Sequence, residues 1–216
     1  MHPMTHTEIS KTINLPEYID KEIYLLGSIL PDFYLFDINR LINLINLKFN
    51  LNLKKIEKEN KNKNHSKKEI LKLLKNTNKE EKEYSLLIGM LSHLIVDKIA
   101  HEEMVIKELN KYDNDEQNNH FLLEKYMDLY INKSFSNYKE IYQRLNFKNI
   151  NIFFKSKISN DSKILNLINY FLWKGFILYK IYIEKKEYKN NNVDFEYYLN
   201  KSKSTLKNDL KFYKII

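Results

Sequence analysis

The chain has 216 residues, of which 43% are hydrophobic and 30% charged, and its formal net charge is +8. This length fits one domain, residues 1–216, with a substantial core, and it leaves little room for a second domain of equal size. Cysteine is absent, which excludes a disulfide framework and any zinc site built on thiolates. With only three glycines and three prolines, the composition disfavours turn-rich β architectures and predicts an all-α fold.

Helical spacing of apolar residues recurs along the chain, and no alternating pattern is long enough to indicate a strand. Thr5 can cap the first helix and Pro16 can begin the second. Because the residue before a proline is pushed out of the α region, we expect Asp32, just after Pro31, to lie at a helix exit. The predicted bundle has helices, in chain order, over residues 5–14, 16–27, 38–49, 66–74, 80–107, 120–132, 136–145, 162–185 and 196–213.

Charge and hydropathy also bear on location and partners. The positive net charge could attract anionic substrates such as phospholipid headgroups or nucleic acid, although runs such as residues 54–68 are typical of a solvated loop. Residues 164–183 approach the length of a membrane span but contain two asparagines and two lysines, which favours a buried or amphipathic helix. The first residues lack the pattern of a secretory signal, so we expect a cytoplasmic protein.

The strongest candidate for chemistry is a helical segment in which His93, Asp97 and His101 follow one another at four-residue steps. At about 100° per residue, their side chains fall within an arc of about 80° and can converge on a metal ion. The surrounding residues are apolar nearly all round the helix, so His93 and Asp97 should be desolvated. A carboxylate there is costly unless it is paired or metal-bound. The alternative interpretation is a His–Asp hydrogen bond inside the core.

A second histidine–carboxylate pair, His120 and Glu124, repeats the four-residue step on the next predicted helix. Two ligands on adjacent turns can share one ion, although His and Glu at this spacing also commonly form an exposed pair. The metal-site interpretation of this pair is favoured because the pair follows the first motif across a short polar break. We therefore expect the two helices to be antiparallel neighbours. Judged singly, Asp32, His6 and His65 are more typical of caps or surface positions than of a site.

Taken in order, these residues resemble the zinc-dependent phospholipase C family, which is structurally related to zinc-dependent single-strand nucleases. The resemblance is carried by Thr5 and His6 before a helix, residues 26–32, His65 ahead of a helix, residues 85–93 leading into Asp97 and His101, and His120 with Glu124. These motifs lie within residues 5–124, and residues 125–216 would complete the helical bundle. The resemblance implies a hydrolase of phosphodiester bonds.

The resemblance also implies a role for each residue. His65, His93 and Asp97 would hold one zinc ion, with Asp97 able to bridge to a neighbour; His101, His120 and Glu124 would hold another, and His6 would contribute to a third. Asp32 would be the general base. Zinc ions about 3.5 to 4 Å apart offset the charge that grows on a phosphate as water attacks it. No covalent nucleophile is needed, and two or three zinc ions remain open.

Three hypotheses follow. The leading one is a zinc-dependent, phospholipase C-like hydrolase acting on a phospholipid or a smaller phosphodiester, with transient contact to a membrane surface. The second is a zinc-dependent single-strand nuclease, which the basic balance and 16 tyrosines permit, since bases stack on aromatic rings. Basic and aromatic residues do not interleave around the ligands, so nucleic acid is less favoured. The third is a non-catalytic helical scaffold stabilised by metal. The oligomeric state stays open.

Overall fold

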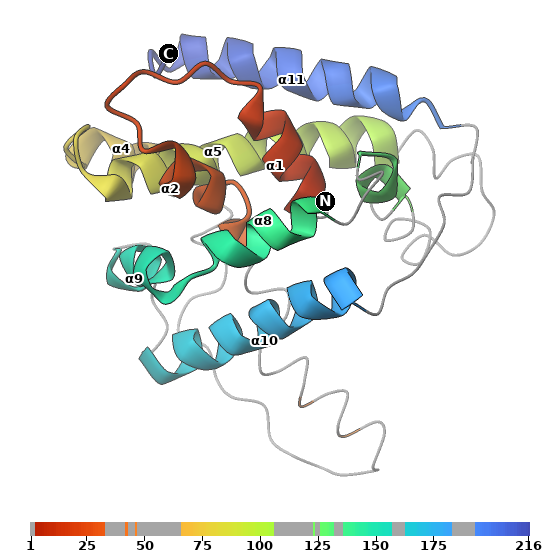
Figure 1. Ribbon diagram of the computed structural model, residues 1–216. Coiled ribbons are helices and arrows are strands. Elements are labelled where there is room, and N and C mark those ends of the chain that lie inside the picture. The colour runs from red at the N-terminus through yellow and green to blue at the C-terminus, as the bar shows by residue number, and fades with distance from the viewer. Residues whose placement is uncertain are drawn as a thin grey trace.

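The computed structural model describes residues 3–32, 42, 46, 66–105, 123, 126–131, 136–156, 163–182 and 193–216. Every regular element in these residues is a helix, so the predicted all-α class is confirmed (Figure 1). The elements are α1 (Pro3–Lys11), α2 (Lys21–Gly27), α4 (Lys67–Asn76), α5 (Lys82–Ile99), the π-helix η3 (Ala100–Val105), α8 (Ser136–Arg144), α9 (Phe147–Lys155), α10 (Lys163–Tyr182) and α11 (Phe195–Phe212).

Helix α5 is the centre of the fold. Its sequence is apolar on nearly every side, and α1, α2, α4, α9 and α11 all pack against it. Figure 1 shows α5 crossing the middle of the molecule, with α11 along one side of it and α1 and α2 in front. A helix that is apolar all round is expected to be buried in this way. The element that carries the predicted ligands is therefore the most enclosed one.

Two helix starts differ from the sequence prediction. Helix α2 begins at Lys21 and not at Pro16, because the side chain of Asp20 accepts hydrogen bonds from the backbone N–H groups of Glu22 and Ile23. An aspartate that caps orphan N–H groups is a stronger start signal than a proline four residues upstream. The prediction that Thr5 caps the first helix is wrong, since Thr5 lies inside α1. Ser66, at the start of the predicted helix 66–74, caps α4 because its side chain accepts a hydrogen bond from the backbone N–H of Glu69.

Helices α2 and α5 touch at two glycines. A Cβ atom built on Gly27 would lie 2.2 Å from the carbonyl oxygen of Leu86, and one built on Gly89 would lie 2.0 Å from that of Tyr24. Only residues without a side chain allow two backbones to approach so closely. This contact fixes how the end of α2 sits against the middle of α5. The residues that follow each glycine, Ser28 and His93 among them, are thereby brought together.

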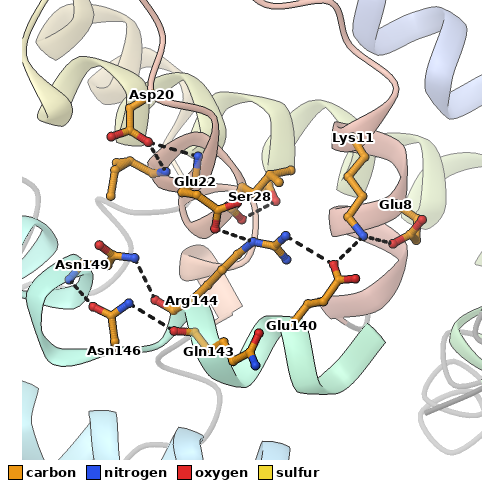
Figure 2. Close-up of polar contacts among 12 residues, drawn as sticks. Glu8, Lys11, Asp20, Glu22, Ser28, Glu140, Gln143, Arg144, Asn146 and Asn149 are labelled. Atoms are coloured by element: carbon orange, nitrogen blue, oxygen red, sulfur yellow. Dashed lines mark hydrogen bonds and ion pairs between the residues drawn. The ribbon is translucent and has the colours of Figure 1, made fainter. Parts of the chain in front are cut away.

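A polar network joins α8 to α1 and α2 (Figure 2). The guanidinium group of Arg144 donates to Glu22 at 3.1 Å and to Glu140 at 3.3 Å, and Lys11 reaches the same Glu140 carboxylate at 2.8 Å. Arg144 is mostly buried whereas Glu22 and Glu140 are partly solvated. The network therefore fixes where α8 lies against α1 and α2. Because its carboxylates are partly solvated, it adds little to the free energy of folding.

The C-terminal half adds α9, α10 and α11. The predicted helices 136–145, 162–185 and 196–213 correspond to α8, α10 and α11, whereas α9, which Asn146 caps, was not predicted. The predicted helix 38–49 lies outside the described residues except for Ile42 and Asn46, which are helical, and much of 120–132 also lies outside them. Among the helices that the structure describes, none is long and apolar enough to cross a bilayer.

Candidate metal centre

Three predicted residues from different parts of the chain meet inside the helical core. His6 comes from α1, Asp32 from the short turn after α2, and His93 from α5. The Nε2 atom of His6 lies 4.0 Å from Asp32 Oδ2, and the Nε2 atom of His93 lies 3.5 Å from Asp32 Oδ1. One ligand atom from each residue lies within 4.8 Å of the others, and all three residues are buried. They form a group that can hold a metal ion.

Asp97 extends this group towards His101. Its Oδ1 atom lies 3.8 Å from His6 Nε2 and 3.3 Å from His101 Nε2. Two atoms that both bind one zinc at 2.0–2.1 Å in tetrahedral geometry are about 3.3 Å apart, so these separations are close to those of a ligand set. The structure therefore brings five predicted residues together. Asp97 lies between histidines from α1 and η3.

The orientation of His93 is fixed by the α2–α5 contact. Its Nδ1 atom lies 2.9 Å from the carbonyl oxygen of Ser28. A carbonyl can only accept, so Nδ1 carries a proton, and Nε2 is the ring nitrogen that faces Asp32. Histidines that bind metals commonly donate their second ring N–H to a backbone carbonyl, which sets the tautomer and aims the free nitrogen. Ser28 is a residue whose role the sequence did not predict.

The protonation states suit metal binding. Burial, together with the nearby imidazole of His93, holds the pKa of His6 well below its usual value, so His6 is neutral. The two rings stack with centroids 3.8 Å apart, an arrangement that two imidazolium cations would oppose. Burial raises the pKa of Asp97, but the hydrogen bond with His101 and the surrounding histidines outweigh it and keep that pKa well below the usual range. Neutral histidine and ionised aspartate are the forms that bind zinc.

The ring nitrogens of His6 are buried polar atoms that a metal ion could satisfy. His6 is completely buried, and within the described residues neither of its ring nitrogens has a hydrogen-bond partner. Most buried polar side-chain atoms are hydrogen-bonded, so an exception calls for an explanation such as a bound ion. Nitrogen and carboxylate ligands in a compact group suit zinc. The residues present therefore fit the metal that the resemblance implies.

A buried carboxylate, Asp128, anchors the segment that carries His6. Its Oδ1 atom accepts hydrogen bonds from the backbone N–H of Thr5 at 2.8 Å and from the Thr5 hydroxyl at 2.6 Å. Its Oδ2 atom accepts from the hydroxyl of Tyr138 on α8 at 2.7 Å. Asp128 therefore joins α1 to α8 directly beside His6. Nothing in the local sequence distinguishes it, since its partners are 123 and 10 residues away.

Replacing Asp128 with Ala is expected to lower the free energy of unfolding by about 3 kcal/mol, because buried donors of Thr5 and Tyr138 lose their acceptor. Asp128→Asn keeps one acceptor oxygen for Thr5 and should lose clearly less. Urea unfolding of both variants beside the wild type measures the difference. Equal losses for the two variants would contradict the assigned hydrogen bonds.

The helix changes its winding just after Asp97. Residues of η3 form a π-helix, and π-helical turns frequently occur at functional sites. His101 lies on η3, and Glu103 two residues later accepts from the Nζ atom of Lys201 on α11. The wider turn thus presents His101 to Asp97 while Glu103 faces another helix. The sequence predicted a continuous helix here and gave no sign of this change.

Three predicted ligands, His65, His120 and Glu124, lie outside the described residues. Their assignment to zinc stays a prediction, as does the number of ions. Of the predicted site residues, the structure describes His6, Asp32, His93, Asp97 and His101.

The family model described as Zinc dependent phospholipase C matches residues 5–211, nearly the whole chain. The chain belongs to the zinc-dependent phospholipase C family, and the resemblance seen in the sequence is confirmed. Searches of curated proteins and of solved structures gave no match.

Proposed function

We propose that this protein hydrolyses a phosphodiester bond of a phospholipid, using zinc held by its buried histidine and aspartate residues. The observation that carries the proposal is the convergence of His6, Asp32 and His93, all buried, on one point inside the core. The family implies zinc and a phospholipid substrate. Burying two imidazoles and a carboxylate without a metal would be costly, which is why such a group rarely serves stability alone.

The proposed ligands are His6, His93, Asp97 and His101, together with His65, His120 and Glu124 from outside the described residues. Asp97 would hold zinc together with the neighbouring histidines, because its Oδ1 atom lies near nitrogens of both His6 and His101. His93 is held ready by its hydrogen bond to Ser28. Zinc bound here would polarise the phosphoryl group and lower the pKa of a coordinated water.

Asp32 is the proposed general base. Its carboxylate faces the nitrogens of His6 and His93 at 4.0 and 3.5 Å, so it borders the place where a metal and an attacking water would sit. A carboxylate at that place can orient the water and accept its proton. The proposed reaction transfers the phosphoryl group to water directly, with no covalent intermediate on the chain.

Metal content and turnover test the proposal together. Protein purified without chelator is expected to contain stoichiometric zinc and to cleave phosphatidylcholine in micelles. Removing zinc with a chelator should abolish turnover and lower the melting temperature, because a ligand that binds only the folded state stabilises it, and added zinc should restore both. Protein with no stoichiometric metal would disprove the proposal.

The same assay separates the alternatives. Cleavage of single-stranded DNA in place of phosphatidylcholine would identify a nuclease. A protein that chelation unfolds, but that never hydrolyses even an activated nitrophenyl phosphodiester, would be a metal-stabilised scaffold.

A further inference from the structure

Helix α10 has an apolar stripe on its outer side. Ile164, Leu167, Phe171 and Tyr179 follow one another at helical spacing, and their exposed fractions are 72%, 39%, 61% and 48%. The opposite side of α10 is buried and packs against α8. Among the described helices, α10 lies at the edge, with α8 between it and both α1 and α5 (Figure 1). An exposed helix normally places polar side chains on its outer face, so this stripe departs from the expected pattern.

The stripe continues onto α9. Phe147, at the first position of α9, is 58% exposed, and its ring makes an edge-on contact with Tyr170 at 6.3 Å between centroids. Tyr170 in turn contacts the ring of Phe171 at 5.2 Å. The exposed rings of Phe147 and Phe171 thus both contact the buried ring of Tyr170, and we call the exposed apolar side chains of the two helices the α9–α10 face. Contiguous exposed apolar patches mark surfaces that bind a protein or a membrane.

Every charged residue within α9 (Phe147–Lys155) and α10 (Lys163–Tyr182) is a lysine. Neither α9 nor α10 contains an aspartate or a glutamate, although acidic residues are common elsewhere in the chain. The two helices carry five lysines: Lys148, Lys155, Lys163, Lys174 and Lys180. Helices that combine an apolar, aromatic face with lysines and lack acidic residues have the composition of helices that lie in a membrane interface. Each lysine near an anionic bilayer surface adds to the attraction.

We propose that the α9–α10 face binds the surface of a phospholipid bilayer that contains anionic lipid. The choice of a bilayer over a protein partner rests on the proposed function, because a phospholipid hydrolase must reach substrate that is packed in a bilayer. The described helices are too short or too polar to cross that bilayer, so α10 lies along it. Phe147, Ile164 and Phe171, the three most exposed side chains of the face, enter the headgroup region.

Vesicle sedimentation of the 216-residue chain tests the face without requiring turnover. The double variant Ile164→Gln/Phe171→Gln removes two apolar side chains while keeping residues that suit a helix. It should bind vesicles of phosphatidylcholine with phosphatidylserine about tenfold more weakly than the wild type, since two side chains lose their transfer from water. The matched control is Phe212→Gln, because Phe212 is 79% exposed on α11, outside the face, and this variant should bind like the wild type.

Zinc content and melting temperature of the double variant should equal those of the wild type. Unchanged vesicle binding would overturn the proposal, and so would an equal loss in Phe212→Gln. A lower melting temperature of the double variant would show that other parts of the folded chain cover the face. If the wild type forms a dimer that the double variant does not form, the face binds a second copy of the chain. Either result overturns the proposal. A loss of binding without any lipid hydrolysis by the wild type would support the face and contradict only the proposed function.

Discussion

Gly89→Ala is expected to prevent stable folding of this protein. The added methyl group would lie 2.0 Å from the carbonyl oxygen of Tyr24 and 2.8 Å from the Cα atom of Gly27. Both neighbours are backbone atoms of another segment, so no side chain can move aside to relieve the clash. Helices α2 and α5 would have to separate, which costs the most extensive helix–helix contact among the described elements. The loss should exceed about 3 kcal/mol, the upper range for ordinary overpacking.

Thermal unfolding followed by circular dichroism measures this effect, and Gly175→Ala is the matched control. A Cβ atom on Gly175 would meet nothing within 4 Å, and this glycine lies exposed in the middle of α10. Alanine favours the helix there by about 0.5–1 kcal/mol, so the control should be slightly more stable than the wild type. A Gly89→Ala protein as stable as the control would show that the α2–α5 contact is looser than described.

The glycine contact also matters for the metal centre. Gly89 lies one helical turn before His93, and Gly27 directly precedes Ser28, whose carbonyl orients that histidine. Separating the helices would therefore break the hydrogen bond that aims His93. Any residual folded Gly89→Ala protein should bind zinc more weakly than Gly175→Ala.

The helical class and much of the site could be predicted from the sequence because their signals are local. The four-residue steps of His93, Asp97 and His101 follow from the geometry of one helix, and the apolar surroundings indicate burial. His6 and Asp32 were different, because each alone resembles a cap or a surface residue. Only the order of motifs along the chain linked them to α5, and the structure places both next to His93.

The features that sequence analysis missed depend on contacts between distant segments. Asp128 is recognisable only through its hydrogen bonds to Thr5 and Tyr138, and Thr5 could not be excluded as a cap while that partner was unknown. The π-helical winding of η3 has no compositional signature of its own. Helix α9 is short, and its cap, Asn146, follows α8 almost without a break, so its start was not distinguished.

Asp32→Asn is expected to reduce the rate of phosphodiester hydrolysis by about 10²–10⁴-fold while the protein keeps its zinc. The amide has nearly the same shape as the carboxylate, so His6 and His93 retain a neighbour of the same size. An amide cannot accept a proton at neutral pH, and the proposed base is lost. Steady-state kinetics on phosphatidylcholine and zinc analysis of the same preparation measure the two effects separately.

Asp97→Asn supplies the contrast, because the same chemical change is made to the other carboxylate of the centre. Asp97 faces His6 and His101 through one oxygen, and its low pKa shows that the surroundings favour its ionised form. Loss of that charge removes a proposed zinc ligand, so this variant should lose both zinc and activity, and its melting temperature should fall towards that of the chelated wild type.

If Asp32→Asn also loses its zinc, Asp32 is a ligand and another group must accept the proton. If both variants keep zinc and activity, neither carboxylate belongs to the reacting centre, and the buried group of His6, Asp32 and His93 needs a different explanation.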